Sequence, residues 1–262
     1  LTNVDSLKRT KIDVYDDILD KGTVECRAWR PTLYDFLSHR ALGFMMNSEP
    51  DVSRPANRFT VNSDEYLKPY VDFVNLNLTN PSDSLETKYY ALNIMKDLTV
   101  FHKNDANPNA LIDIELLRLD YIYANSQNAK KDTLYFNSLK ALQTKFPSNE
   151  RVTEIDFRIA NWYLQKATKY KPLEGDSYKW YKKTAKEICE SAIAKFPKSY
   201  GALECKNTLN AIHSKSFNLT IEEVNEPNKP FRALVSSQNI NKIYFKIVKT
   251  SSQELRELSR KK

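Results

Sequence analysis

The sequence has 262 residues, a formal net charge of +7 and 41% hydrophobic residues. Its 4 glycines stand against 15 tyrosines and 12 phenylalanines, which disfavours an enzyme built on glycine-rich loops and favours helices. No run of about 18 apolar residues is present, so no membrane span is predicted. The length allows one or two domains.

Residues 1–63 are predicted to form an N-terminal helical segment that ends in a loop over 47–62, where prolines and polar residues cluster. Residues 1–25 favour one short amphipathic helix. Its inward-facing residues are expected to be Leu7, Val14, Ile18 and Leu19. A second helix is expected after Pro31, because proline suits the first turn of a helix. The residues expected on its buried face are Leu33, Phe36, Leu37 and Ala41.

Residues 64–215 alternate helical blocks with proline and asparagine punctuation. We place the helices at residues 64–76, 83–103, 108–127, 129–146, 150–170, 176–196 and 200–214. Apolar residues recur at helical spacing within the blocks, which predicts antiparallel helix pairs. The residues expected in the interior of these pairs include Leu116, Leu142, Ile159, Trp162, Ile188 and Phe196.

A weak internal repeat lies in this region. Residues 145–147 and 195–197 both read Lys-Phe-Pro, and each triplet ends a predicted helix before a polar cap. Tetratricopeptide arrays use proline in this way to stop one helix so that the next folds back. The triplets lie about 50 residues apart, which exceeds the usual period of about 34 residues. The sequence therefore predicts a tetratricopeptide-like region with elongated or irregular helix pairs.

Most of the excess positive charge lies in the second half of the chain. A dense set of lysines there is Lys166, Lys169, Lys179, Lys182, Lys183 and Lys186. The simplest interpretation is a solvated helix face, and the functional one is a surface for an acidic partner. Because the set holds no arginine and the nearby aromatic residues are needed for helix packing, no nucleic-acid partner is predicted.

Residues 216–262 predict β structure, from about Ser216 to Lys249. Apolar residues occupy every second position in 217–221 and again in 243–247. Two or three strands cannot bury a core alone, so this tail either packs on the helices or a second copy, or begins a larger β domain. We favour the larger domain. The residues expected at unpaired strand edges are Phe231, Val235, Phe245 and Ile247.

The fold class predicted for the whole chain is therefore mainly α, with an antiparallel helical-repeat array followed by a short C-terminal β segment. The sequence lacks a glycine-rich phosphate loop, a His-Glu-x-x-His zinc motif and a Gly-x-Ser-x-Gly elbow. Neither catalytic residues nor a cofactor or metal site are predicted.

Histidines and cysteines are few and widely spaced. The histidines, expected at surface or capping positions, are His39, His102 and His213. The cysteines, expected to act as small buried apolar residues, are Cys26, Cys189 and Cys205. Cys189 and Cys205 could also face each other across a helix pair, where a disulfide bond would fit an oxidising compartment.

Three stretches together carry a family resemblance. They are RPTLYDFLSHRAL at 30–42, LEGDSYKWYKK at 173–183, and the segment from EEVNEPNKPF to NKIYFKI at 222–247. In order and spacing they resemble the amino-terminal region of the large alpha-2-macroglobulin-like proteins of Bacteroidetes bacteria. In such proteins a helical region precedes the first macroglobulin-type β-sandwich, so the resemblance implies that residues 216–262 hold the first strands of that sandwich.

The resemblance implies a segment of a bacterial cell-envelope protein in the periplasm or on an outer-membrane lipid anchor. The complete protein would entangle attacking proteases, and this segment would be its non-catalytic scaffold or docking module. Its partners would be the remaining macroglobulin domains, other envelope proteins or proteases. Covalent relatives carry a Cys-x-Glu-Gln thioester, and none of the three cysteines here stands in that motif. The alternative is a stand-alone tetratricopeptide-type adaptor for a peptide or an acidic protein.

Overall fold

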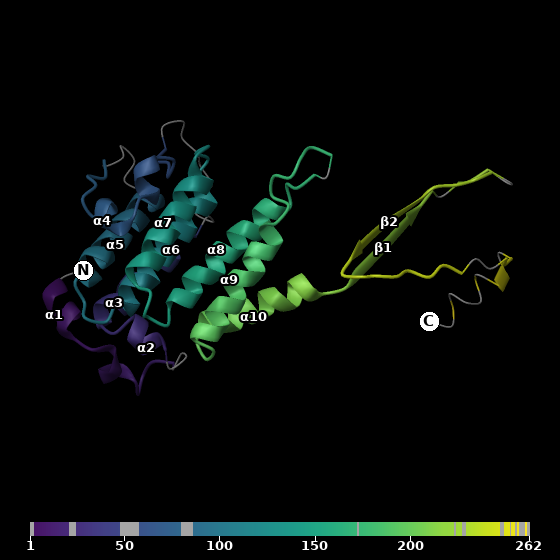
Figure 1. Ribbon diagram of the computed structural model, residues 1–262. Helices are drawn as coiled ribbons and strands as arrows, with labels where there is room; N and C mark the ends of the chain where they lie inside the picture. Colours follow the sequence, from purple (N-terminus) through teal and green to yellow (C-terminus); the bar gives the residue numbers. More distant parts are fainter. Residues whose placement is uncertain are drawn as a thin grey trace. The chain divides into compact units, whose positions relative to one another are not determined.

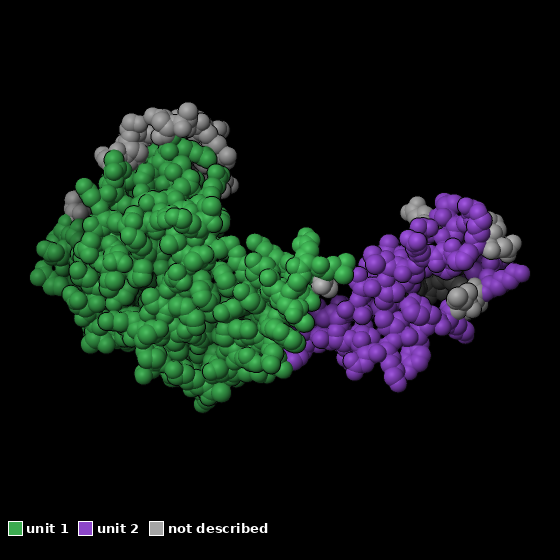
Figure 2. All heavy atoms as spheres, turned by 45° about the horizontal axis from the view of Figure 1, so that its top comes forward, with its two compact units in different colours: residues 1–209 green, residues 210–262 purple. Residues whose placement is uncertain are grey.

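The computed structural model describes residues 3–20, 25–47, 58–79, 86–171, 173–222, 224–226, 229–246, 249–251, 253–254, 256 and 260. The fold is mainly helical, with a two-stranded antiparallel sheet near the C-terminus (Figure 1). The chain divides into two compact units, Leu1–Leu209 and Asn210–Lys262 (Figure 2). The predicted N-terminal segment, residues 1–63, therefore belongs to the same unit as the helices that follow it.

Unit 1 opens with short helices. They are α1 (Val4–Arg9), the 3-10 helix η1 (Ile12–Tyr15), α2 (Cys26–Trp29) and α3 (Leu33–Met45). The prediction of one helix over residues 1–25 is wrong, and Val14 and Ile18 are 73% and 78% exposed. The helix stops because Lys11 and Thr32 form an antiparallel bridge, which takes the backbone between α1 and η1 out of helical geometry.

Helix α3 begins after Pro31, as predicted, but its buried face differs from the predicted one. The hydroxyl of Thr32 accepts the backbone N–H of Asp35, while the Asp35 carboxylate accepts the Thr32 N–H in return. The buried residues are Tyr34, Asp35, Ser38 and Leu42. Asp35 and Ser38 are polar, so the spacing of the apolar residues indicates the neighbouring face of the helix instead.

The next helices of the described residues follow in order. They are η2 (Asp64–Leu67), α4 (Tyr70–Phe73), α5 (Thr87–His102), α6 (Asn109–Asn125), α7 (Lys131–Lys145), α8 (Val152–Ala167), α9 (Tyr181–Lys195) and α10 (Tyr200–His213). From α5 to α9 each helix packs against the next (Figure 1). The single helix predicted at 64–76 is two short ones, because Pro69 between them cannot continue a helix.

The predicted interior of these helices is largely confirmed. Leu116, Leu142 and Ile159 are each at most 4% exposed and belong to one core cluster. Trp162 and Ile188 are partly buried and pack against that cluster. Phe196 is also partly buried.

The two Lys-Phe-Pro corners have matching backbone geometry. Phe146 follows α7 and Phe196 follows α9. Their amide N–H groups donate to the carbonyls four residues earlier, Leu142 and Ala192, at 3.2 and 3.1 Å. Each phenylalanine carbonyl in turn accepts the amide three residues later, at 3.2 and 3.1 Å. The internal sequence repeat therefore corresponds to a repeated turn at the end of a helix.

Cys189 on α9 and Cys205 on α10 are buried and unbonded. They share a small core cluster with Ala160, Ala185 and Ala192. A hydrogen bond with Cys189, together with burial, raises the pKa of the Cys205 thiol. The two cysteines thus act as small buried residues, as the first of the two interpretations predicts.

His102 is buried and His39 is largely buried, so the prediction of surface or capping positions is wrong for both. Their side chains are 9% and 2% exposed, whereas His213 is exposed. His102 Nε2 lies 2.6 Å from Asp35 Oδ1, and its Nδ1 lies 2.7 Å from Asp105 Oδ2. Burial disfavours the charged imidazole, but the hydrogen bonds and charges of these two carboxylates outweigh it and raise the pKa of His102 above 6.5.

The pKa of His39 shifts in the opposite direction to that of His102. Burial, followed by the charge of Arg30, lowers its pKa from 6.5 to about 4. By linkage, the stability that His102 contributes is complete below pH 6.5 and is lost as the pH rises through its raised pKa. The stability that His39 contributes is complete above pH 6.5 and is lost as the pH falls through about 4.

We expect the two histidines to shape opposite limbs of the stability profile. His102→Gln should flatten the decline in unfolding free energy above pH 6.5, and His39→Gln should flatten the decline between pH 6.5 and about 4. Urea unfolding followed by circular dichroism from about pH 4 to 9 measures both limbs. A His102→Gln protein that keeps the wild-type alkaline limb would contradict the assignment.

Unit 2 contains β1 (Ser216–Ile221) and β2 (Ala233–Gln238), paired antiparallel. Strand β1 begins at Ser216, the residue at which the sequence predicts the change to β structure. The second predicted strand is not found, because residues 239–246 carry no strand. An alternating apolar pattern indicates which side chains would share one face of a strand. It does not show that a neighbouring strand is present to form the hydrogen bonds.

Candidate interaction sites

The β1–β2 hairpin has one apolar face. Leu219 lies opposite Val235 in the register, and Phe217 and Ile221 share the face of Leu219 because side chains alternate along a strand. The exposed fractions are 46% for Phe217, 37% for Leu219, 43% for Ile221 and 38% for Val235. Such a set of neighbouring exposed apolar side chains is typical of a surface that another protein layer covers.

Side-chain amides tie the hairpin to the end of α10. Asn239 Nδ2 donates to the carbonyls of Ile212 and Ser214 at 2.7 and 2.9 Å. Gln238 Nε2 approaches the same two carbonyls at 3.3 and 3.4 Å. Asn239 adopts a positive φ of 55°, which asparagine tolerates better than most residues. The end of β2 is thereby held at the helix terminus, where the last carbonyls have no partner within the helix.

The predicted edge residues do not share one strand edge. Val235 lies in β2, whereas Phe231 and Phe245 lie outside the strands and are 52% and 62% exposed. Ile247 lies outside the described residues. The apolar surface of the hairpin is therefore formed mainly by Phe217, Leu219 and Ile221, which the sequence pattern identified as a strand.

The predicted lysine surface lies on α8, α9 and the segment between them. Acidic partners occupy four of its lysines, in the pairs Lys166–Asp132, Lys179–Asp176, Lys183–Glu187 and Lys186–Glu190. Lys169 and Lys182 are exposed. An acidic protein would have to compete with these carboxylates, because each of them cancels much of the positive field of its lysine.

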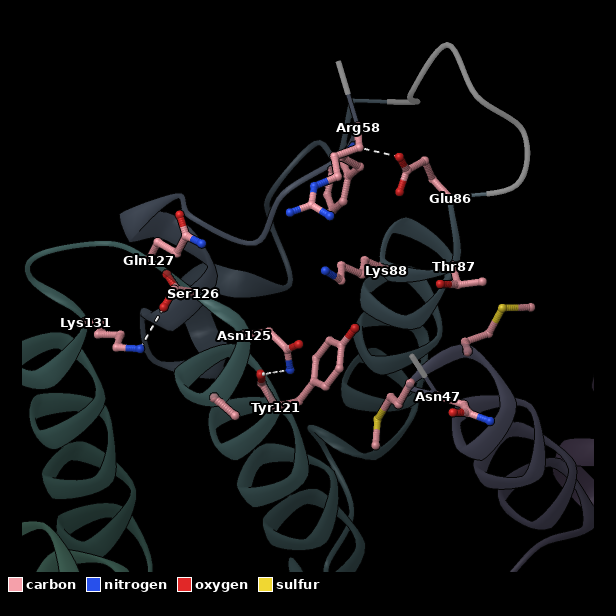
Figure 3. Close-up of a pocket in the computed structure, with 14 residues that line it drawn as sticks. Asn47, Arg58, Glu86, Thr87, Lys88, Tyr121, Asn125, Ser126, Gln127 and Lys131 are labelled. Carbon is pink, nitrogen blue, oxygen red and sulfur yellow. Dashed lines mark hydrogen bonds between the residues drawn. The ribbon is translucent and has the colours of Figure 1, made fainter. Parts of the chain in front are cut away.

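A polar cavity of about 440 Å³ lies in unit 1, where the ends of four helices meet (Figure 3). It is lined by Met45, Met46, Asn47, Arg58, Phe59, Glu86, Thr87, Lys88, Tyr121, Ala124, Asn125, Ser126, Gln127 and Lys131. These residues come from the C-terminal ends of α3 and α6, the first turns of α5 and α7, and residues 58–59 before η2. The volume falls in the range of small-ligand pockets.

Two of the charged residues in the cavity wall have structural partners. Lys131 Nζ donates to the carbonyls of Tyr123 and Ser126 at 3.1 and 2.7 Å, and so satisfies the C-terminal end of α6. Glu86 Oε1 accepts the backbone N–H of Phe59 at 3.0 Å. Both contacts fix the shape of the cavity wall.

No sequence pattern predicts this cavity. Its residues come from four separate segments of the chain, and Tyr121 follows the same helical spacing as a core residue. The only local signal was the pair of polar helix ends at 86–88 and 125–127, which is common in any helical protein.

Among the described residues, no group of three or more His, Cys, Asp or Glu side chains is placed to hold a metal ion. None of the described helices is long and apolar enough to cross a membrane. Comparisons of the chain with protein families, with curated proteins and with solved structures find no match.

Proposed function

We propose that this chain is a non-catalytic docking module of an alpha-2-macroglobulin-like protease-trap protein of the bacterial cell envelope. In this proposal unit 1 is the scaffold, and the β1–β2 hairpin joins a macroglobulin-type β-sandwich. The observation that carries the proposal is the exposed apolar face of the hairpin, formed by Phe217, Leu219, Ile221 and Val235.

An isolated two-stranded hairpin is marginally stable in water, and a third strand or a second layer is needed for a stable sheet. In a β-sandwich the apolar faces of two sheets pack about 10 Å apart with interdigitated side chains. The hairpin has the alternating pattern that such packing uses, because Asn218 and Thr220 lie on the face opposite Leu219.

The occupant we propose is the remainder of the sandwich rather than an acidic peptide. The stretch at 222–247, which carries part of the family resemblance, includes all of β2. The two matching corners after α7 and α9 support a tetratricopeptide-like scaffold in unit 1. The alternative adaptor function would use the lysine surface. The four acidic partners there reduce its positive potential.

Strand complementation tests the proposal. The probe is the first macroglobulin-type sandwich domain of a Bacteroidetes alpha-2-macroglobulin-like protein, prepared without its first two strands. We expect this chain to bind it, because the hairpin supplies the missing strands. Leu219→Asn/Val235→Asn should weaken binding by about tenfold or more, since both changes remove buried apolar surface. The matched control, Asn218→Thr/Ser236→Thr, alters the opposite face and should bind as the wild type does.

Calorimetry and sedimentation velocity distinguish the outcomes. Absence of binding to the truncated domain would contradict the proposal. Self-association of this chain that Leu219→Asn/Val235→Asn abolishes, without any binding to the domain, would identify a second copy as the occupant and would also overturn the proposal.

A further inference from the structure

The largely buried side chain of Tyr121 presents its hydroxyl to the cavity in unit 1. Tyr121 is 8% exposed, and its hydroxyl points into the cavity beside Lys88 (Figure 3). That hydroxyl makes no hydrogen bond to any residue that the structure describes. Two other tyrosines of the same helix pair, Tyr123 and Tyr135, each donate to a carboxylate at 2.7 Å. The Tyr121 hydroxyl differs from these two because its hydrogen-bonding capacity is left for whatever occupies the cavity.

The Tyr121 hydroxyl is a hydrogen-bond donor at neutral pH. Burial raises the pKa of Tyr121 to about 12, so the phenol keeps its proton. A ligand that faces this hydroxyl would therefore gain most by offering an acceptor oxygen.

The first turn of α5 adds positive potential to the same cavity. Its N-cap residue, Glu86, makes no side-chain hydrogen bond to the amides of α5, because its carboxylate accepts the N–H of Phe59 instead. The free amides and the helix dipole leave partial positive charge at this end of α5. Thr87 and Lys88, the first two residues of the helix, both line the cavity.

Besides Arg58, which has an interaction of its own, the cavity wall contains two basic residues, Lys88 and Lys131, and the acidic Glu86. The ammonium group of Lys131 donates to carbonyls at the end of α6. The side chain of Lys88 lies near the Tyr121 hydroxyl at the first turn of α5 (Figure 3).

We propose that this cavity binds a small organic molecule through a carboxylate or phosphate group. The anionic oxygens accept hydrogen bonds from Lys88 and the Tyr121 hydroxyl at the first turn of α5, in the manner of anions at helix N-termini. Met45 and Met46 give the cavity an apolar side, which suits a short hydrocarbon body on the ligand. This binding is independent of the docking proposed for the hairpin.

Nuclear magnetic resonance titration of the whole chain tests the site. Inorganic phosphate and butyrate are the two probes, and they separate a phosphate ligand from a carboxylate ligand. We expect at least one probe to shift the backbone amide signals of Thr87, Lys88 and Asn125 in a saturable manner. Lys88→Gln and Tyr121→Phe should each weaken the affinity for that probe by about tenfold, because each removes one hydrogen bond to a charged group.

The control is Lys182→Gln, which removes the same charge from an exposed lysine on α9 and should leave the affinity unchanged. Tyr121→Phe keeps the ring, so a preserved thermal midpoint shows that lost binding is local. Saturation by phosphate alone or by butyrate alone supports the site and names the anionic group. If neither probe saturates, or if Lys88→Gln and Tyr121→Phe bind as tightly as the wild type, the proposal is overturned.

Discussion

Gly201→Ala is expected to destabilise unit 1 by about 3 kcal/mol, the upper end of the usual range for overpacking. A Cβ atom at this position would lie 2.3 Å from the backbone N of Glu154 and 2.3 Å from the carbonyl carbon of Thr153. Backbone atoms at the start of α8 cannot turn away as a flexible side chain can, so α10 would have to move outward. Urea unfolding monitored by circular dichroism measures the loss.

Gly43→Ala is the matched control. Gly43 lies in α3, and a Cβ atom there would meet nothing within 4 Å. Alanine loses less conformational freedom than glycine in a helix, so this change should stabilise the protein by about 0.5–1 kcal/mol. Opposite signs for the two substitutions would establish that close approach, rather than helix propensity, requires glycine at position 201. A loss below about 0.5 kcal/mol for Gly201→Ala would refute the packing argument.

Most of the long helices could be predicted from the sequence. Proline and asparagine punctuation, together with apolar spacing, placed α5 to α10 within a few residues of their observed ends. The Lys-Phe-Pro triplets marked two real corners. These signals succeed because they are local, and because each long helix buries an apolar stripe against its neighbours.

Several of the errors arise where polar side chains are buried. Asp35 and His102 have the residue types of a surface, and yet they lie together at 1% and 2% exposure, joined by a hydrogen bond of 2.6 Å. Their positions are 67 residues apart in the chain. No local pattern reveals such a pair, since each charge becomes acceptable in the interior only when the partner is in place.

The candidate sites also differ in how far local sequence patterns predict them. The hairpin face was predictable because its apolar residues are consecutive alternate positions of one strand. The cavity was not, because Lys88 and Tyr121 meet only after α5 and α6 pack. Among the lysine pairs, Lys183–Glu187 and Lys186–Glu190 have the helical i,i+4 spacing and could have been foreseen. Lys166–Asp132 depends on the packing of α7 against α8.

Arg118 is the clearest case of a buried charge that holds distant segments together. It is fully buried on α6, and its guanidinium donates to Glu115 Oε1 at 2.9 Å and to Glu115 Oε2 at 2.5 Å. It also donates to the carbonyls of Tyr66 and Lys68 at 2.5 and 3.0 Å, and lies 4.3 Å from the centre of the Phe73 ring. One side chain thus connects α6 with both η2 and α4.

Arg118→Met should destabilise unit 1 by about 3–5 kcal/mol, because it leaves the buried Glu115 carboxylate without its charged partner and the carbonyls of Tyr66 and Lys68 without the guanidinium donor. Urea unfolding gives the magnitude, and hydrogen exchange at residues 66–68 should show earlier opening there than in α8. Adding Glu115→Gln to Arg118→Met removes the unpaired charge and should restore part of the loss. Lys68→Met is the control: its pair with Glu65 is solvent-exposed, so the unfolding midpoint should hardly move. Equal losses for Arg118→Met and Lys68→Met would show that the buried network does not stabilise the fold more than a surface ion pair does.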